Sequence, residues 1–174
     1  MLMVLLVVLL FGCRGFFIID DSNYLQYRDL RKIEFLKQLV DSAEIKYYID
    51  KKYNVKIFYP DFMNIADTSK AGAAHFKSSY SDMSFELSVD TNLFKSNVEK
   101  AVNYLVYITD SATTCLDKGE NSYLAKGKSF LQKGFLMDNN WIEYKMSYNK
   151  NHEEIIGWLI NLMKQWEPRE DHKK

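Results

Sequence analysis

The chain has 174 residues, of which 47% are hydrophobic and 15% aromatic, a length that suffices for one domain with a sizeable core. Its 23 basic and 23 acidic residues balance to a formal net charge of zero at pH 7, which argues against a nucleic-acid-binding protein or a polyanion mimic. With only seven Gly and two Pro among many aromatic residues, the chain is not predicted to be disordered.

The first thirteen residues form an apolar run that ends in a small residue and a cysteine, Leu10-Phe11-Gly12-Cys13. The run is shorter than the roughly 20 apolar residues that span a bilayer, but it has the length of a signal-peptide core. The segment resembles a bacterial lipoprotein signal peptide whose lipobox is residues 10–13. The resemblance implies that residues 1–12 are removed and that Cys13 becomes the lipidated first residue of the mature protein.

Two other interpretations of this segment are open. An uncleaved membrane anchor could extend through Ile19, although Arg14 would then lie in the membrane at a cost of at least about 2.5–3.5 kcal/mol. A buried core helix normally has a polar face, which this run lacks.

The lipoprotein resemblance also implies a location. It places the protein in the bacterial cell envelope, lipid-anchored on the periplasmic side of a membrane. Arg14 occupies the position where an Asp tends to retain Gram-negative lipoproteins in the inner membrane, so the resemblance favours the outer membrane in a Gram-negative source.

Residues 13–23 are predicted to form a short tether, which is followed by a first helix from Ser22 or Asn23 to about Val40. A second helix is predicted from Asp41 to Asn54, because Asp41 and Glu44 resemble a capping box. The alternation of Ile45, Tyr47 and Ile49 leaves a hairpin as the alternative there. A strand is expected over residues 55–59, and a loop over 61–72.

The middle of the chain is predicted to contain two strands, His75–Tyr80 and Met83–Val89, in which apolar and polar residues alternate. The longest helix is predicted over residues 92–117 and a polar loop over 120–128. Cys115 falls on that helix, which has a strong apolar stripe, and this predicts a buried, inert thiol.

Near the C-terminus, Phe130–Met137 and Trp141–Tyr148 are predicted to form a hairpin around residues 138–140. A last helix is expected over residues 151–166. Together these elements predict one α+β domain over residues 24–167, with an antiparallel sheet of about five strands packed against about four helices and a charged tail over 168–174.

The sequence contains no convincing catalytic or metal-binding motif. His152-Glu153-Glu154 starts like a zinc-protease motif, but the second histidine that the motif requires is replaced by Ile156. His75 and His172 have no partner at ligand spacing. Asp138 lies near Glu143 in sequence, but a place in a tight turn explains that carboxylate sufficiently. We therefore expect no catalytic residue, metal or cofactor, and Cys13 is the one functional residue assigned.

These observations predict a membrane-tethered, non-catalytic module that binds a protein and no nucleic acid. An immunity-type lipoprotein that neutralises an envelope-directed toxin or enzyme is one specific form. A structural or assembly lipoprotein of an envelope complex is a second hypothesis. A third is a ligand-binding or enzymatic domain in which His75, Tyr80 and Asp138 converge in one pocket.

Overall fold

The computed structural model describes residues 21–109 and 112–169. Its contacts divide the chain into two units, Met1–Glu34 and Phe35–Lys174, and both sheets, α3, α4 and the candidate site lie within the second. The described residues contain three α-helices, which are α2 (Asp21–Asp41), α3 (Val98–Ile108) and α4 (Gly157–Gln165), and one short 3-10 helix, η1 (Lys150–His152).

The described residues also form nine strands in two antiparallel sheets. The smaller sheet is a hairpin of β1 (Ile45–Asp50) and β2 (Val55–Pro60). The larger sheet has seven strands in the order β3-β4-β5-β9-β8-β7-β6. These strands are β3 (Met63–Asp67), β4 (Ala73–Ser78), β5 (Ser84–Thr91), β6 (Thr114–Lys118), β7 (Ser122–Lys126), β8 (Phe130–Met137) and β9 (Asn140–Ser147).

The two faces of the seven-stranded sheet contribute to different cores. Successive side chains of a strand point to opposite faces, so Tyr144 of β9 lies on one face and Trp141 on the other. Tyr144 belongs to the larger core, which includes residues of α4 and of the β1–β2 hairpin. Trp141 belongs to a smaller core with Val98, Val102 and Leu105 of α3. The two helices therefore pack on opposite faces.

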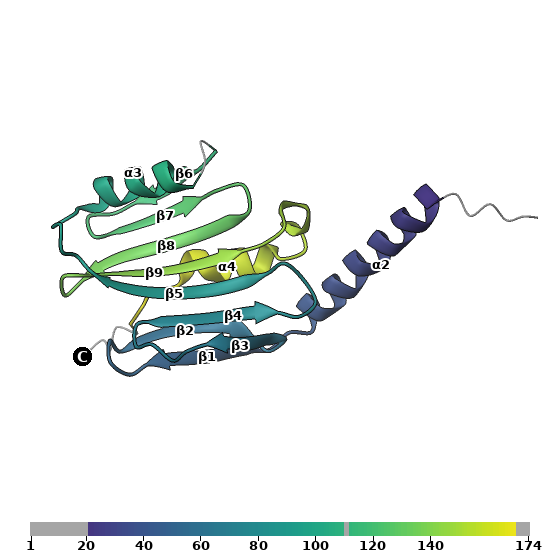
Figure 1. Ribbon diagram of the computed structural model, residues 1–174, viewed down its shortest axis with the longest axis horizontal. Coiled ribbons are helices and arrows are strands. Elements are labelled where there is room, and N and C mark those ends of the chain that lie inside the picture. Colours follow the sequence, from purple (N-terminus) through teal and green to yellow (C-terminus); the bar gives the residue numbers. More distant parts are fainter. Residues whose placement is uncertain (1–20, 110–111, 170–174) are drawn as a thin grey trace, which may run out of the picture. The chain divides into compact units, whose positions relative to one another are not determined.

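Helix α3 covers only one end of its face. It contacts β6 and β7, and Figure 1 shows it at that end of the sheet, away from β4 and β5. The side chains of His75, Glu86 and Ser88, which share this face farther along the sheet, remain partly exposed. The open half of this face is where the candidate site lies.

The predicted fold class was wrong, because the protein is mostly β: nine strands and three α-helices occupy the described residues, instead of about five strands and four helices. The segment 41–54, which was predicted as a helix, contains β1 and the turn of the β1–β2 hairpin; a hairpin had been the alternative. The carboxylate of Asp50 accepts hydrogen bonds from the backbone of Lys52, Tyr53 and Gly72, which fixes the hairpin turn and ties it to the start of β4.

The predicted helix over 92–117 is also shorter in the structure. Asn97 caps α3 by accepting a hydrogen bond from the backbone of Lys100, and the helix ends at Thr109, whose hydroxyl bonds to the carbonyl of Leu105. Residues 114–118 form β6 instead. Cys115 is therefore an exposed residue of a strand, and the prediction of a buried helical thiol was wrong.

Three more predicted boundaries or loops differ. The predicted loop over 61–72 contains β3, the predicted loop over 120–128 contains β7, and the last helix is limited to α4. The structure confirms the end of the first helix near Val40, the strand after Val55, both strands of the β4–β5 pair, and the β8–β9 hairpin. Asp138 and Asn139 have φ of 50° and 59°, as a two-residue hairpin turn of type I′ requires.

Candidate functional site

A row of polar side chains crosses the open face of the seven-stranded sheet. In the register of these antiparallel strands, one residue of each strand lies directly opposite one residue of the next strand, so together they form a line across the sheet. From β3 to β8 the row consists of Asp67, His75, Glu86, Lys145 and Gln132. Within it, Nε2 of His75 lies 3.6 Å from Oε1 of Glu86.

Glu143 lies next to this row and is held by two residues from strands farther along the sheet. The hydroxyl of Tyr123 donates to Oε1 of Glu143 at 2.5 Å and accepts a hydrogen bond from Nε2 of Gln132 at 2.8 Å. Gly134 stands between Tyr123 and Glu143 in the register, and a Cβ there would lie 2.2 Å from the Tyr123 ring. The missing side chain of Gly134 thus lets Tyr123 reach across β8.

The environment of Glu143 disfavours its charge. Burial raises the pKa of this carboxyl above its ordinary value, and the hydrogen bonds from Tyr123 and Gln132 offset only part of that effect. Burial also raises the pKa of the Tyr123 phenol strongly, so this hydroxyl remains a donor. Among the described residues, no cationic group lies within ion-pair distance of Glu143.

Lys145 is the basic residue nearest to Glu143 in sequence, but its ammonium group is not within ion-pair distance of Glu143 or Glu86. Its Nζ lies 5.3 Å from the centre of the Phe130 ring. It forms no ion pair with Glu86, its cross-strand partner, in the part of the chain that the structure describes. Among the described residues, His75 is therefore the one basic group within ion-pair distance of Glu86, and Glu143 has none at that distance.

An apolar pocket of about 590 Å³ adjoins these carboxylates. It lies between α3, the segment that follows β5, and the sheet. Its apolar lining residues are Leu93, Phe94, Ala101, Tyr104, Leu105, Ile108 and Trp141. The indole N–H of Trp141 is buried and has no acceptor among the described residues. The volume is in the range of pockets that hold small ligands or single large side chains.

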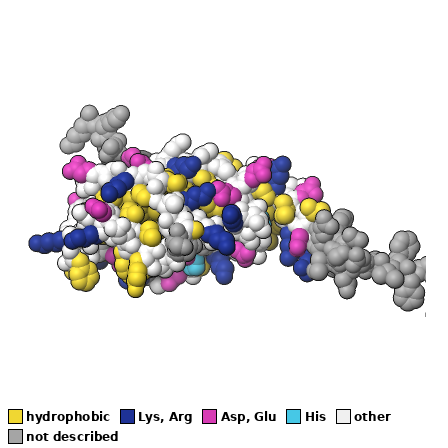
Figure 2. Space-filling model, turned by 90° about the horizontal axis from the view of Figure 1, so that it is seen from above, with side chains coloured by type: hydrophobic (Ala, Val, Ile, Leu, Met, Phe, Trp, Pro, Cys, Tyr) yellow, Lys and Arg dark blue, Asp and Glu magenta, His cyan; other side chains and the backbone are white. Residues whose placement is uncertain are grey.

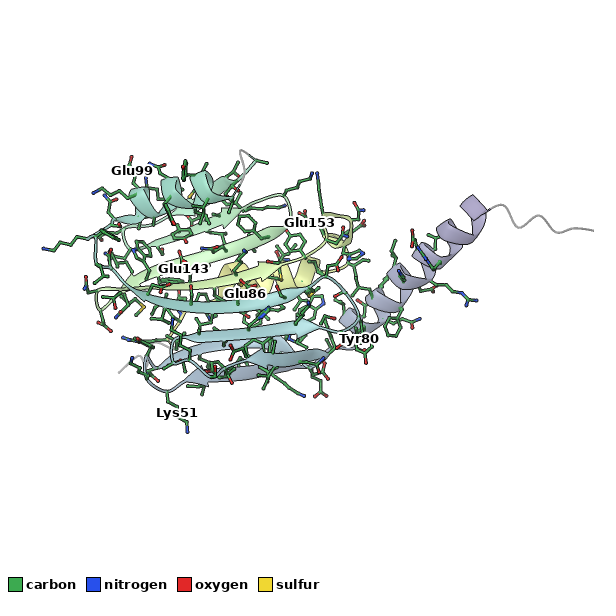
Figure 3. All side chains as sticks on the ribbon, viewed as in Figure 1. Lys51, Tyr80, Glu86, Glu99, Glu143 and Glu153 are labelled. Atoms are coloured by element: carbon green, nitrogen blue, oxygen red, sulfur yellow. The ribbon has the colours of Figure 1, made fainter. Side chains whose placement is uncertain are left out.

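A second, more polar cavity of about 410 Å³ lies over the row of polar side chains. The two cavities share Gln132, Glu143 and Lys145 as lining residues, so they are two halves of one depression. We call this depression the α3 groove. Figure 3 shows Glu86 and Glu143 on neighbouring strands in the middle of the sheet.

The rim of the apolar half carries large hydrophobic side chains that point into solvent. The side chain of Phe94 is 88% exposed and that of Tyr107, one turn along α3 from Tyr104, is 86% exposed. Leu93, Tyr104 and Ile108 are also exposed. Figure 2, which views the molecule from the α3 side, shows hydrophobic side chains gathered between charged ones. Single exposed apolar residues are ordinary, but a contiguous group marks a binding surface.

The three residues of the convergent-pocket hypothesis do not come together. Tyr80 lies in the β4–β5 connection, which leads to Ser84 opposite Ser147 at one end of β9, whereas Asp138 lies in the turn at the other end of β9. Eight residues of strand, about 26 Å, separate those ends. Figure 3 shows Tyr80 at the edge of the sheet, far along it from Glu143. Only His75 lines the α3 groove, so the hypothesis of a pocket shared by these three residues was wrong.

The other sequence candidates also lie outside the groove. Cys13 and His172 fall outside the described residues. His152 belongs to η1 and does not begin the last helix as predicted, while Glu153 pairs with Lys126. Among the described residues, no group of His, Cys, Asp and Glu side chains is arranged to hold a metal ion.

Sequence reasoning missed the residues that form the groove. Glu143 was noted only as a neighbour of Asp138, and Tyr123 was assigned to a loop. Leu93 and Phe94 were included in the predicted helix over residues 92–117, so their exposure was missed as well. Chemically, the groove combines an apolar cavity with more carboxylates than lysines, which suits binding of a partly apolar, cationic group.

Comparisons with known proteins add one structural likeness. No family model matches the chain, and no curated protein matches it. The chain resembles the solution structure of cyanobacterial PsbP (CyanoP) from Synechocystis sp. PCC 6803, with 12% identity and a TM-score of 0.49 over 70% of this chain and 90% of that one. A likeness of this size carries no argument about function.

None of the helices in residues 21–109 and 112–169 is both long enough and apolar enough to cross a bilayer.

Proposed function

We propose that this protein is a lipid-anchored protein of the bacterial envelope that binds a partner protein, without catalysing a reaction, through the α3 groove and its hydrophobic rim. The observation that carries the proposal is the group of large apolar side chains around the groove, above all Phe94 and Tyr107. Exposed aromatic residues of this kind provide much of the binding energy in protein interfaces.

The extent of this surface favours a protein over a small ligand. A small molecule in the apolar pocket would contact Tyr104 and Ile108, which line it, but Tyr107 does not line the pocket. Covering Tyr107 together with Phe94 requires a partner that extends beyond the cavity. Burying such rings contributes roughly 25 cal/mol for each Å² of apolar surface removed from water.

The proposed anchor determines where such a partner would be found. A lipid on Cys13 would tether the binding domain to a membrane. An inhibitor of an envelope-directed enzyme and a scaffold of an envelope complex would both use a surface of this kind. They differ in the identity of the partner.

Site-specific photo-crosslinking in intact cells tests the proposal. A photoreactive phenylalanine analogue would replace Phe94 or Tyr104 at the rim, and Tyr47 of β1 in the control. Tyr47 is a suitable control because its exposed fraction, 58%, is close to the 64% of Tyr104, while it lies in the layer that packs on the opposite face of the sheet.

We expect a crosslinked product of discrete, higher mass from the Phe94 and Tyr104 positions and none from the Tyr47 position. Equal crosslinking from all three positions would indicate nonspecific contact and would contradict the proposal. Absence of any protein crosslink from the rim, in cells that contain the full chain in the membrane, would also contradict it.

A further inference from the structure

We infer that the partner segment is an extended peptide with a hydrophobic residue and, two positions along, a lysine or arginine: the hydrophobic side chain fills the apolar half of the α3 groove, and the cation pairs with Glu143 and Glu86. This inference rests on the proposed function and specifies the chemistry that the groove recognises.

The spacing along β9 supports this pattern. Trp141 lines the apolar half, and Glu143 follows two residues later on the same face of the sheet. Alternate residues of a strand lie about 7 Å apart. An extended peptide that lies over this face with its backbone parallel to β9 has the same spacing between side chains on one side. A hydrophobic residue at Trp141 therefore places the side chain two positions along beside Glu143.

The charges of the groove favour a basic ligand. Four carboxylates line its two halves, which are those of Asp67, Glu86, Asp90 and Glu143, and they face two lysines, Lys100 and Lys145, and one histidine, His75. Lys145 is drawn toward the Phe130 ring, and only His75 lies within 4 Å of Glu86. The excess of acidic groups attracts a cation and repels an acidic segment.

The partial burial of Glu143 increases the selectivity of the groove for a cationic ligand. A buried carboxylate without a cationic partner is unfavourable, and a ligand cation would remove that cost. A guanidinium group can donate several hydrogen bonds in one plane, and Glu86 and Glu143 come from adjacent strands in neighbouring rows. Arginine is thus the better of the two basic residues for this position.

Fluorescence anisotropy with labelled peptides tests the inference on the full chain extracted in detergent. The probe is the peptide Gly-Ser-Phe-Ser-Arg-Ser-Gly. Two matched peptides replace its Arg with Glu or its Phe with Ser. Unlabelled phenethylamine serves as competitor, because it combines a phenyl ring with a cationic amine and has no peptide backbone.

We expect the Phe–Arg peptide to bind at least about tenfold more tightly than either matched peptide. The Glu peptide loses a charge-assisted hydrogen bond, and the Ser peptide loses the burial of the Phe ring. Glu86→Gln and Glu143→Gln should reduce that preference for Arg over Glu. Glu86 is partly exposed, so its variant is expected to fold even if the Glu143 variant does not. Glu154→Gln, which removes an exposed carboxylate outside the groove, should leave the preference unchanged.

Equal affinity for the Arg and Glu peptides, or a preference that both Gln variants retain, would overturn the inference. Competition by phenethylamine as strong as that by unlabelled peptide would identify a small amine as the occupant and would also overturn it. Rim crosslinks in cells are independent of these results. If the crosslinks form and the peptides show no charge preference, the inference fails while the proposed function stands.

Discussion

Gly134 is the position on β8 that allows Tyr123 to reach Glu143. A Cβ at this position would lie 2.2 Å from one ring carbon of Tyr123, and that ring is buried. We expect Gly134→Ala to lower the free energy of unfolding by about 1–3 kcal/mol, the usual cost of overpacking a well-filled site. The displaced hydroxyl would also lose Glu143 and Gln132. Urea denaturation of the variant measures the change.

Gly157→Ala provides the matched control for Gly134→Ala. Gly157 begins α4, and an added Cβ there would meet no atom within 4 Å. We expect the free energy of unfolding to stay the same or to rise by up to about 1 kcal/mol, because alanine favours helix over glycine. If Gly134→Ala changed the free energy of unfolding as little as this control does, the close approach of Tyr123 would not depend on the missing side chain of Gly134.

Glu143 should make the stability of the protein depend on pH. Its pKa is raised in the folded protein, mainly by burial, so the folded state binds the proton more tightly than the unfolded state. Stability contributed by this group is therefore largest at acidic pH, falls as the pH rises above the unfolded value of about 4.3, and levels off above the raised folded value.

The variant Glu143→Gln isolates this contribution because it removes the titrating group and keeps a similar shape. We expect the free energy of unfolding of the wild type, relative to the variant, to decrease between about pH 4 and the raised folded pKa. Denaturation at a series of pH values measures the difference. A difference that is constant with pH, or that increases as pH rises, would contradict the assigned direction.

At the residue scale, sequence patterns could not predict the groove. Tyr123 and Glu143 are 20 residues apart and meet only because β7, β8 and β9 pair in a specific register. Nothing local to either residue encodes that register. The exposure of Cys115 could not be predicted from sequence for a similar reason. It depends on whether residues 114–118 form a helix or a strand, and a short apolar pattern fits both.

At the scale of elements, the β8–β9 turn depends on two residues in the left-handed conformation. Asn139 has a φ of 59°, which glycine adopts without strain and β-branched residues avoid. We expect Asn139→Gly to stabilise the protein slightly and Asn139→Val to lower the free energy of unfolding by about 1–2 kcal/mol. Thermal denaturation of both variants measures these effects.

Asn121→Val is the control for the turn substitution. Asn121 is an exposed residue between β6 and β7 and does not have a positive φ. Its replacement should change stability by less than about 0.5 kcal/mol. A similar loss at both positions would mean that the cost comes from replacing a surface asparagine and not from the left-handed turn.

The elements that sequence predicted correctly are those with a strong local pattern. In β5, Phe85 and Leu87 alternate with Glu86 and Ser88, because one face of the sheet is buried and the other is open. The edge strands β3 and β6 have mostly exposed residues and a register shift each, so neither shows that alternation. Their formation depends on a neighbouring strand that supplies the hydrogen bonds.

At the scale of the whole molecule, one face of the seven-stranded sheet packs the larger core and the other face carries the proposed binding groove. The face toward α4 and the β1–β2 hairpin carries the larger core, which includes the fully buried Phe76, Phe85 and Tyr144. The opposite face is covered by α3 at one end and leaves the rest for the α3 groove. Substitutions such as Glu86→Gln on the open face can therefore change binding with little effect on the core.

Lipid anchoring of the whole molecule is a separate prediction that centres on Cys13. If the lipobox interpretation is correct, cells that express the wild type incorporate labelled palmitate into the protein, and the mass of the membrane-extracted chain lacks residues 1–12. Cys13→Ala should abolish both the label and the cleavage, because the thiol is the group that accepts the lipid and residue 13 follows the cleavage site.

Cys115→Ala makes this experiment decisive. Cys115 is the one other cysteine of the chain and is exposed, so it is the alternative site at which a thiol could be acylated. We expect Cys115→Ala to keep the palmitate label and the shortened mass. Label that survives in Cys13→Ala, or that is lost in Cys115→Ala, would contradict lipidation at Cys13. An unlabelled wild type with an intact N-terminus would leave an uncleaved anchor as the explanation and would remove the lipid from the proposed function.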